Sequence, residues 1–283
     1  MSRRQRGIAL ISVLLIMSLA LLITGGLLRH HRLSLQGSGQ HLQYMHLRQL
    51  AAGGEIHGLL LLQDVLLAPE KTVDRTQPWA RVMPDLDRDD GQVRVVIEDL
   101  AGRFNINALL RSGQIDQVTL NRWARLLELL GQPPLQLNQV GPLRELSQLR
   151  LLPGVDAQLL RQLEPWVAML PPDAALNINT APALVLRTLG EVEAATAQAL
   201  IVQGSATPWS SAQDFTKDPL LSGSELNGHG LGIHSRWYRI SVEVAGSGRG
   251  LRLITDVELD PDAKRLNVLQ RRFLPLSADE MPQ

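Results

Sequence analysis

Residues 8–28 read IALISVLLIMSLALLITGGLL, a run of 21 residues without a charged side chain. As an α-helix, a run of this length extends about 31 Å and matches the hydrocarbon core of a bilayer, which is roughly 30 Å thick. The apolar stretch of a secretory signal peptide is shorter, about 7–15 residues, and ends at a small-residue cleavage site. This run continues instead into Leu27, Leu28 and Arg29. The pattern therefore favours a retained transmembrane helix over a signal peptide.

The composition of the whole chain narrows the classes of function. Of 283 residues, 28 are Lys or Arg, 28 are Asp or Glu, and none is Cys. Five arginines and no acid precede residue 33, which leaves 23 basic and 28 acidic residues in the remainder, a net charge of −5. A body of that charge is poorly suited to hold nucleic acid electrostatically, so nucleic acid is not an expected partner. A chain without cysteine has neither a disulfide framework nor a thiolate metal site.

The residues before the apolar run give it a more specific meaning. A short basic leader ends at Gly7, and the apolar run begins at once with Ile8. This order resembles the leader of type IV prepilins and pseudopilins. The resemblance implies that the prepilin peptidase of the bacterial inner membrane cleaves between Gly7 and Ile8 and methylates the new N-terminal amine. A plain membrane anchor with a chance glycine is the alternative interpretation.

The fifth residue of the mature chain would then be Ser12. Major pilins and pseudopilins have a glutamate there, which neutralises the N-terminal amine of a neighbouring subunit. A serine supplies no charge, and an unpaired buried ammonium group is costly. We therefore expect a place at the tip of a filament rather than a repeated place in its shaft. The arginines before the run favour a cytoplasmic N-terminus, but those directly after it oppose this orientation, so the preference is weak.

The rest of the chain divides by its hydrophobic periodicity. Helical spacing continues to Leu67, before Pro69, and is locally weakened at 37–39 and 53–54, where glycines cluster. Residues 106–233 are mostly helical by pattern, as in 118–130 and 182–202, and no fixed-period repeat is evident. β-Branched density predicts a strand at 93–97, and alternation predicts two more at 239–244 and 251–259. With 266–273 and the two intervening turns, these C-terminal runs predict a three-stranded antiparallel meander.

These elements predict an α+β protein with a pilin-like fold: a long N-terminal transmembrane helix packed on an antiparallel sheet, plus a large inserted all-helical domain. The expected segments are a leader peptide (1–7), a transmembrane helix (8–28), the rest of the long helix and the first strand (29–105), the inserted helical domain (106–233) and the C-terminal strands (234–283).

Five segments, in this order, carry a resemblance to one family, the minor pseudopilin K of type II secretion (general secretion pathway protein K). They are RGIALISVLLI (6–16), IEDLAGRFNINAL (97–109), LRLLPGV (149–155), ALNINTAP (175–182) and SRWYRISVEV (235–244).

The resemblance implies a non-enzymatic subunit at the tip of the type II secretion pseudopilus that caps and primes its assembly with the minor pseudopilins I and J. It also implies a single-pass inner-membrane protein with its N-terminus in the cytoplasm and its body in the periplasm. We expect no catalytic residues and no cofactor. A minor pilin of a type IV pilus has the same leader and fold, and it remains an alternative.

A different alternative is a membrane-anchored DNA receptor. The segments NINTAPALVLRTLGEVEAATAQALI (177–201) and PWSSAQDF (208–215) resemble a helix-hairpin-helix, whose hairpin amides hold a phosphate. The hairpin at 189–193 has one glycine and two glutamates, and residues 133–214 contain four arginines against seven acids. Because negative charge repels phosphate, we favour a structural use of this hairpin.

Two further segments contain residue types that occur at ligand sites. The acidic loop with Asp85, Asp87 and Asp89 is a weak calcium candidate, because its glycine falls one place late for an EF-hand and no glutamate follows at the twelfth position. Members of the family bind metal in an acidic segment of the helical domain, but residues 110–135 here contain only Asp116 and Glu128 as acids, so a family-type calcium site is doubtful. The glycine-rich segment 228–232 is expected to be a flexible connector.

Overall fold

The computed structural model describes residues 3–67, 72–81, 86–88, 91–111, 114–135, 142–224, 226–246 and 249–276. Side chains at 3–12, 86–88, 110–111 and 249 are outside this description. The chain divides into two compact units, Met1–Leu50 and Ala51–Gln283. The first unit is entirely helical where it is described.

The N-terminal helix is the longest element of the chain. Helix α1 runs from Arg3 to Leu67 without a break, so the prediction that it ends before Pro69 is confirmed and neither glycine cluster interrupts it. The described apolar side chains of its first half are exposed, as Leu21 and Leu22 illustrate with 72% and 74% exposure. Within the described residues, this is the one helix long and apolar enough to cross a membrane.

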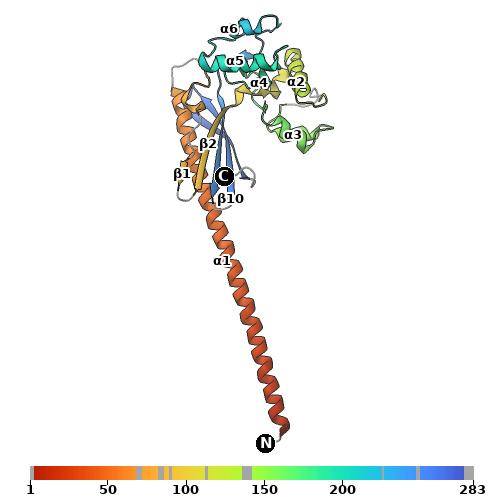
Figure 1. Cartoon of the computed structure of the whole chain (residues 1–283), viewed down its shortest axis with the longest axis vertical. Helices are drawn as coiled ribbons and strands as arrows, with labels where there is room; N and C mark the ends of the chain where they lie inside the picture. Colours follow the sequence, from red (N-terminus) through yellow and green to blue (C-terminus); the bar gives the residue numbers. More distant parts are fainter. Residues whose placement is uncertain are drawn as a thin grey trace. The chain divides into compact units, whose positions relative to one another are not determined.

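The second unit contains a five-stranded antiparallel sheet in the order β1-β2-β9-β10-β11 (Figure 1). Strand β2 pairs with β9, β9 with β10, and β10 with β11, so the predicted meander is confirmed. Before β2 the chain contains the short elements η1 and β1. The bounds are η1 (Pro78–Ala80), β1 (Leu86–Arg88), β2 (Gly91–Asp99), β9 (Trp237–Gly246), β10 (Arg249–Asp260) and β11 (Arg265–Leu276).

A large block is inserted between β2 and β9, which are neighbours in the sheet. Figure 1 shows its helices α4, α5 and α6 beyond one end of the strands and α3 to one side of them. The helices of the block are η2 (Leu100–Gly102), η3 (Ile106–Leu109), α2 (Gln117–Leu129), η4 (Leu146–Leu151), α3 (Ala157–Leu163), α4 (Ala183–Leu186), α5 (Ala194–Ala206), α6 (Ala212–Thr216) and η5 (Pro219–Leu221).

The block is not all-helical, and this corrects the prediction. It also contains three two-stranded ladders, and much of the remaining chain is irregular. The predicted helix 182–202 is two helices, α4 and α5, because Leu189 and Val192 between them are buried in a core. The ladders pair β3 (Phe104–Asn105) with β6 (Val167–Ala168), β4 (Leu110–Arg111) with β5 (Gln114–Ile115), and β7 (Leu176–Asn177) with β8 (Leu231–Gly232).

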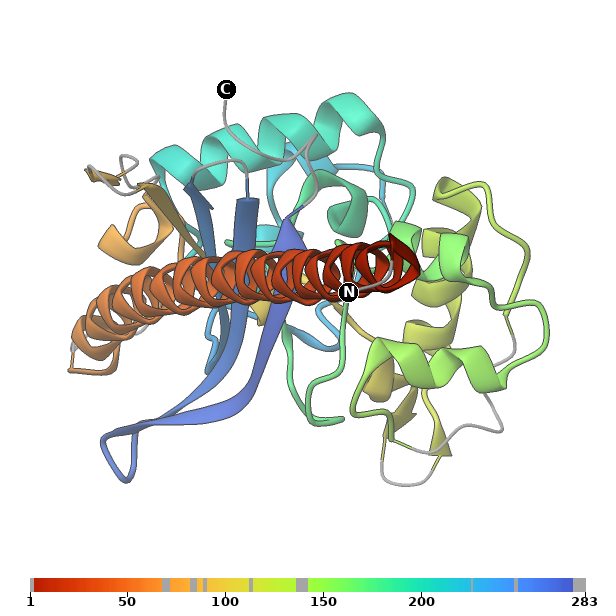
Figure 2. The same ribbon diagram turned by 90° about the horizontal axis from the view of Figure 1, so that it is seen from below.

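The block has two halves, each with its own hydrophobic core. The first core gathers buried residues between Phe104 and Val167, and the second gathers those between Ile178 and Ile233. Figure 2 shows the two halves as separate groups of helices, yellow-green and teal. Trp166 packs against both cores. We refer to 104–170 and 176–233 as the first and second halves.

Candidate assembly site

The last turns of α1, from residue 51 onward, pack tightly on the sheet. A Cβ atom added to Gly54 would lie 2.6 Å from Val242 Cγ1, and one added to Gly58 would lie 2.8 Å from Ile240 Cγ2. Helix and strand β9 therefore approach each other at a distance that only glycine permits. The glycine at 54, which looked from the sequence like a weak point, is a packing position.

The sheet-facing side of these turns also holds a buried carboxylate. Glu55 is 6% exposed and accepts hydrogen bonds from Thr255 Oγ1 (2.7 Å) and Arg271 Nε (2.6 Å). A buried carboxylate needs such partners, and here they come from β10 and β11. The sequence analysis missed this contact. The feature of the sequence that indicates this contact is an acid, Glu55, on the same helical face as Ala51, Gly58 and Leu62.

The opposite side of the same turns is an exposed apolar stripe. Ile56, Leu60 and Leu67 are 57%, 55% and 61% exposed, and Gly53 lies in open space. At about 100° per residue, these four positions fall within roughly 60° of arc, directly opposite the buried face. Polar residues, among them His57 and Gln63, flank the stripe. A helix that is apolar on two opposite sides has one side in contact with its own sheet and one side left for another helix.

The end of β2 joins the sheet to the second half of the block. Asp99 is 7% exposed, and its carboxylate accepts hydrogen bonds from Thr180 Oγ1 (2.6 Å), Asn177 Nδ2 (2.8 Å) and the Ala101 amide (2.8 Å). Burial raises the pKa of Asp99 above its ordinary value, although these hydrogen bonds act in the opposite direction. Asn177 Nδ2 also donates to the Val73 carbonyl (2.9 Å).

A second contact reinforces this junction. Arg75 Nη2 donates to the carbonyl oxygens of Thr180 (2.6 Å) and Ala181 (3.1 Å). The NINTAP segment (177–182) is thus where the segment after α1, strand β2 and the second half meet. This arrangement fixes the second half at the end of the sheet.

The two halves of the block are linked to each other through His229. Its Nε2 lies 2.5 Å from Asp116 Oδ2, and its carbonyl accepts a hydrogen bond from Arg122 Nη1 (2.8 Å). Burial opposes ionisation of Asp116, but hydrogen bonds from Thr119 and His229 outweigh it and lower the pKa of Asp116. The glycine-rich segment is therefore not a flexible connector, because it holds this contact and continues into β8.

The predicted processing and metal residues lie mostly outside the described side chains. Gly7, Ile8 and Ser12 are part of α1, but their side chains are not described. Asp85 and Asp89 lie outside the described residues, and Asp87 is in β1 with its side chain undescribed. Among the residues that are described, no group of three or more potential metal ligands occurs.

The relatives found by comparison with known proteins share one description. The profile of the family described as "Type II secretion system (T2SS), protein K" matches residues 176–234, almost the same residues as the second half. The type II secretion system protein K of Pseudomonas aeruginosa is 28% identical, with 93% of this chain and 92% of that protein covered. That of Klebsiella pneumoniae is also 28% identical, with 96% and 98% covered. The chain is thus similar to type II secretion system protein K over nearly its whole length.

A solved structure extends the likeness to the fold. A chain in the crystal structure of the GspK-GspI-GspJ complex from the enterotoxigenic Escherichia coli type 2 secretion system matches with a TM-score of 0.68. The two are 21% identical, and the match covers 83% of this chain and 98% of that one. The apolar N-terminal helix and the protein K family together fit a single-pass membrane anchor.

Proposed function

We propose that this protein is a minor pseudopilin that occupies the tip of the type II secretion pseudopilus, where it caps the filament and primes its assembly. It is processed by the prepilin peptidase between Gly7 and Ile8, with its N-terminus in the cytoplasm and its body in the periplasm. Its role is structural and involves no catalysis. The partners are the minor pseudopilins I and J, whose counterparts share a crystal with the structural relative.

The observation that carries this proposal is the two-sided end of α1. One side is committed to the sheet through Gly54, Gly58 and Glu55, while the stripe of Ile56, Leu60 and Leu67 is unpartnered in the described chain. Fully burying such a side chain contributes about 1.5–3 kcal/mol, so burial of all three would stabilise contact with another helix. Because the stripe belongs to the same helix as the membrane anchor, its partners are parallel helices of neighbouring subunits.

The inserted block supports the capping role. It enters and leaves the sheet at the same end of β2 and β9, and the Asp99 junction holds its second half there. A rigid block at the end of the sheet occupies space that a further subunit would need. Ser12 offers no charge to the N-terminal amine of a neighbouring subunit, and this also favours a place at the tip.

Copurification of this chain with the minor pseudopilins I and J tests the proposal. The double variant Ile56→Glu/Leu60→Glu places charge on the stripe, and we expect it to lose both partners while the melting temperature of the protein is retained. The matched control is His57→Glu, which flanks the stripe about 100° from Ile56 and about 60° from Leu60 around the helix, and we expect it to copurify normally. Full copurification of the double variant would contradict the use of this stripe.

Mass spectrometry of the mature N-terminus tests the processing step. In cells with the prepilin peptidase we expect a chain that begins at methylated Ile8, and in cells without it an unprocessed chain. A start at Met1 in both strains would instead indicate a plain anchor. Ser12→Glu is expected to alter extraction from the membrane and incorporation into pseudopili, and an unchanged pattern would argue against a special role for this position.

A further inference from the structure

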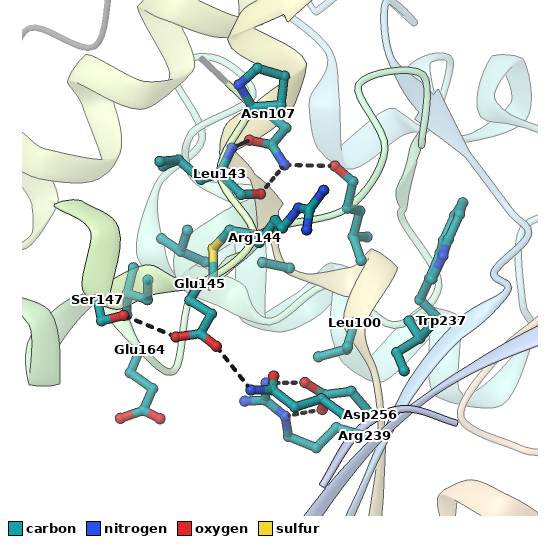
Figure 3. A pocket seen from close by; sticks show the side chains of 18 of the residues that line it. Leu100, Asn107, Leu143, Arg144, Glu145, Ser147, Glu164, Trp237, Arg239 and Asp256 are labelled. Atoms are coloured by element: carbon teal, nitrogen blue, oxygen red, sulfur yellow. Dashed lines mark hydrogen bonds and ion pairs between the residues drawn. The ribbon is translucent and has the colours of Figure 1, made fainter. Parts of the chain in front are cut away.

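A cleft of about 890 Å³ separates the first half of the block from the sheet. Figure 3 shows its two walls, with Arg144 and Glu145 on the side of the block and Arg239 and Asp256 on the strands. The wall of the block comes from the segment before η4, from η4 itself and from α3. At its outer side the cleft is crossed by a hydrogen bond from Gln270 Nε2 to Glu145 Oε1 (3.1 Å), between two side chains in contact with solvent.

Charge in the cleft is not balanced by its own residues. Five arginines line it, and Arg239 is neutralised by Asp256 at 2.7 Å, with Glu164 also acting on it. Glu258 pairs with Arg236, outside the cleft. The other four guanidinium groups form no ion pair within the described residues, and Glu145 and Glu164 are the lining carboxylates left to offset them. The four groups belong to Arg144, Arg150, Arg161 and Arg272.

One of these four groups is unusually constrained. The Nε atom of Arg272 is enclosed by protein and has no hydrogen-bond acceptor among the described residues. A buried donor without an acceptor costs free energy, so this N–H group is a net cost in the isolated chain.

Apolar side chains form the remaining lining. Trp237 is partly buried at the strand end of the cleft, and Leu146 and Leu160 line the side of the block. Leu269 is 55% exposed, next to the irregular pairing of β10 with β11. An aromatic and aliphatic floor with arginines around it is the composition found at sites where one protein recognises a segment of another.

We propose that this cleft binds a short, extended, acidic peptide segment of a second protein. Its apolar side chain packs against Trp237 and Leu160, and its carboxylates pair with Arg144 and Arg272. The volume suits a segment of a few residues and excludes a folded domain. Carboxylates are the matching groups because a guanidinium binds them with two parallel hydrogen bonds. The overall negative charge of the body disfavours nucleic acid as the occupant.

Fluorescence anisotropy with the full-length chain in detergent tests the proposal, so neither pseudopilin partner is needed and failure leaves the proposed function untouched. The probe is a labelled eight-residue peptide of alternating Glu and Asp with a central Leu. We expect saturable binding that weakens with salt. Arg144→Glu and Arg272→Glu should each raise the dissociation constant at least about tenfold, as the loss of one charge-assisted contact predicts.

Controls separate this site from general attraction. Arg81→Glu changes an exposed arginine outside the cleft and should leave binding unchanged. Arg272→Lys, which keeps the charge but not the paired hydrogen bonds, should bind with intermediate affinity. The proposal is overturned if the cleft variants bind like the wild type, or if a peptide with Lys at every acidic position binds equally well. Binding of single-stranded DNA as tight as that of the peptide would overturn it as well. So would tighter peptide binding after deletion of residues 277–283, because it would show that this segment of the chain itself competes for the cleft.

Discussion

The two halves of the inserted block use the same three-residue motif, Asn-Ile-Asn, in the same way. In the first half, Asn107 exchanges two hydrogen bonds with the backbone of Leu143, at 2.7 and 2.8 Å. In the second, Asn179 does so with the backbone of Trp209, at 3.0 and 3.1 Å. Each motif begins in a strand that pairs in parallel with the last strand of its own half. The block is therefore an internal repeat, although no fixed period was evident in the sequence.

The first asparagine of each motif shows how the halves differ. Asn105 Nδ2 donates to the Pro171 carbonyl, which immediately follows its own half. Asn177 Nδ2 donates to Asp99 of the sheet and to Val73. One copy of the motif thus completes its own half, and the other also joins the block to the sheet. The open cleft lies beside the first half, whose motif contacts no buried carboxylate among the described residues. The comparison shows that the second copy of the motif has an additional role, which is to join the block to the sheet through Asn177.

The largest effects are expected in the two cores. Leu149 and Phe215 are fully buried at equivalent places, six residues after Leu143 and Trp209. Leu149→Ala should lower the free energy of unfolding by about 2–5 kcal/mol and Phe215→Ala by about 3–5 kcal/mol. Because the cores are separate, hydrogen exchange of the full-length chain should increase within 104–170 for the first variant and within 176–233 for the second. Equal loss of protection in both halves would show that the halves are one cooperative unit.

Next come the asparagines that distinguish the halves. Asn177→Ala removes a donor from the buried carboxylate of Asp99, and we expect a loss of about 3 kcal/mol. Asn105→Ala leaves only backbone groups unpaired and should cost about 2 kcal/mol. Denaturant unfolding of both variants measures the difference. A larger loss for Asn105→Ala would reverse the assignment of the anchoring role.

A smaller effect is expected at the contact between the halves. Asp116→Asn retains an oxygen for the Thr119 amide but removes the charge beside His229, and it should cost about 1 kcal/mol near pH 6. The folded pKa of Asp116 is lowered, so the stabilisation by its charge is present above the unfolded pKa of about 3.9 and is lost as the pH falls through the folded pKa. Melting curves of wild type and variant should therefore converge in acid, and a constant gap would exclude an ionic contribution.

The smallest effect is expected across the cleft. Gln270→Ala removes the hydrogen bond to Glu145, which both side chains make in contact with solvent. Its effect on the unfolding free energy should stay below about 0.5 kcal/mol. A loss above about 1 kcal/mol would mean that the first half is held to the sheet more firmly than these contacts indicate.

Much of the fold was predictable because it rests on periodicity. The long helix, the strand before the block and the three C-terminal strands each follow the hydrophobic pattern of their element. The internal repeat was hidden because its spacing varies, with 36 residues between Asn107 and Leu143 but 30 between Asn179 and Trp209. A search for a fixed period detects only elements that recur at constant intervals. Here the recurring elements are the Asn-Ile-Asn motif and a later proline, and the spacing between them differs between the two halves.

The contacts of the candidate site were less predictable, for a physical reason. The partners of Glu55 lie on β10 and β11, some 200 residues away, and those of Asp99 lie about 80 residues away. Such pairs are set by tertiary packing, so a sequence shows only that a carboxylate sits on an apolar face. The outer stripe of α1 was visible in the helical spacing, but which apolar side contacts the sheet depended on Gly54 and Gly58.

The insertion of the block between adjacent strands also constrains the order in which the chain can fold. Strands β2 and β9 are separated by residues 100–236, a loop whose closure costs about 3 kcal/mol more entropy than a four-residue hairpin. The meander of β9, β10 and β11 is local and pairs early, but β2 can join it at that lower cost only after the block has condensed. The two small cores of the block therefore shorten the effective loop, and we expect the pairing of β2 with β9 to complete the sheet last.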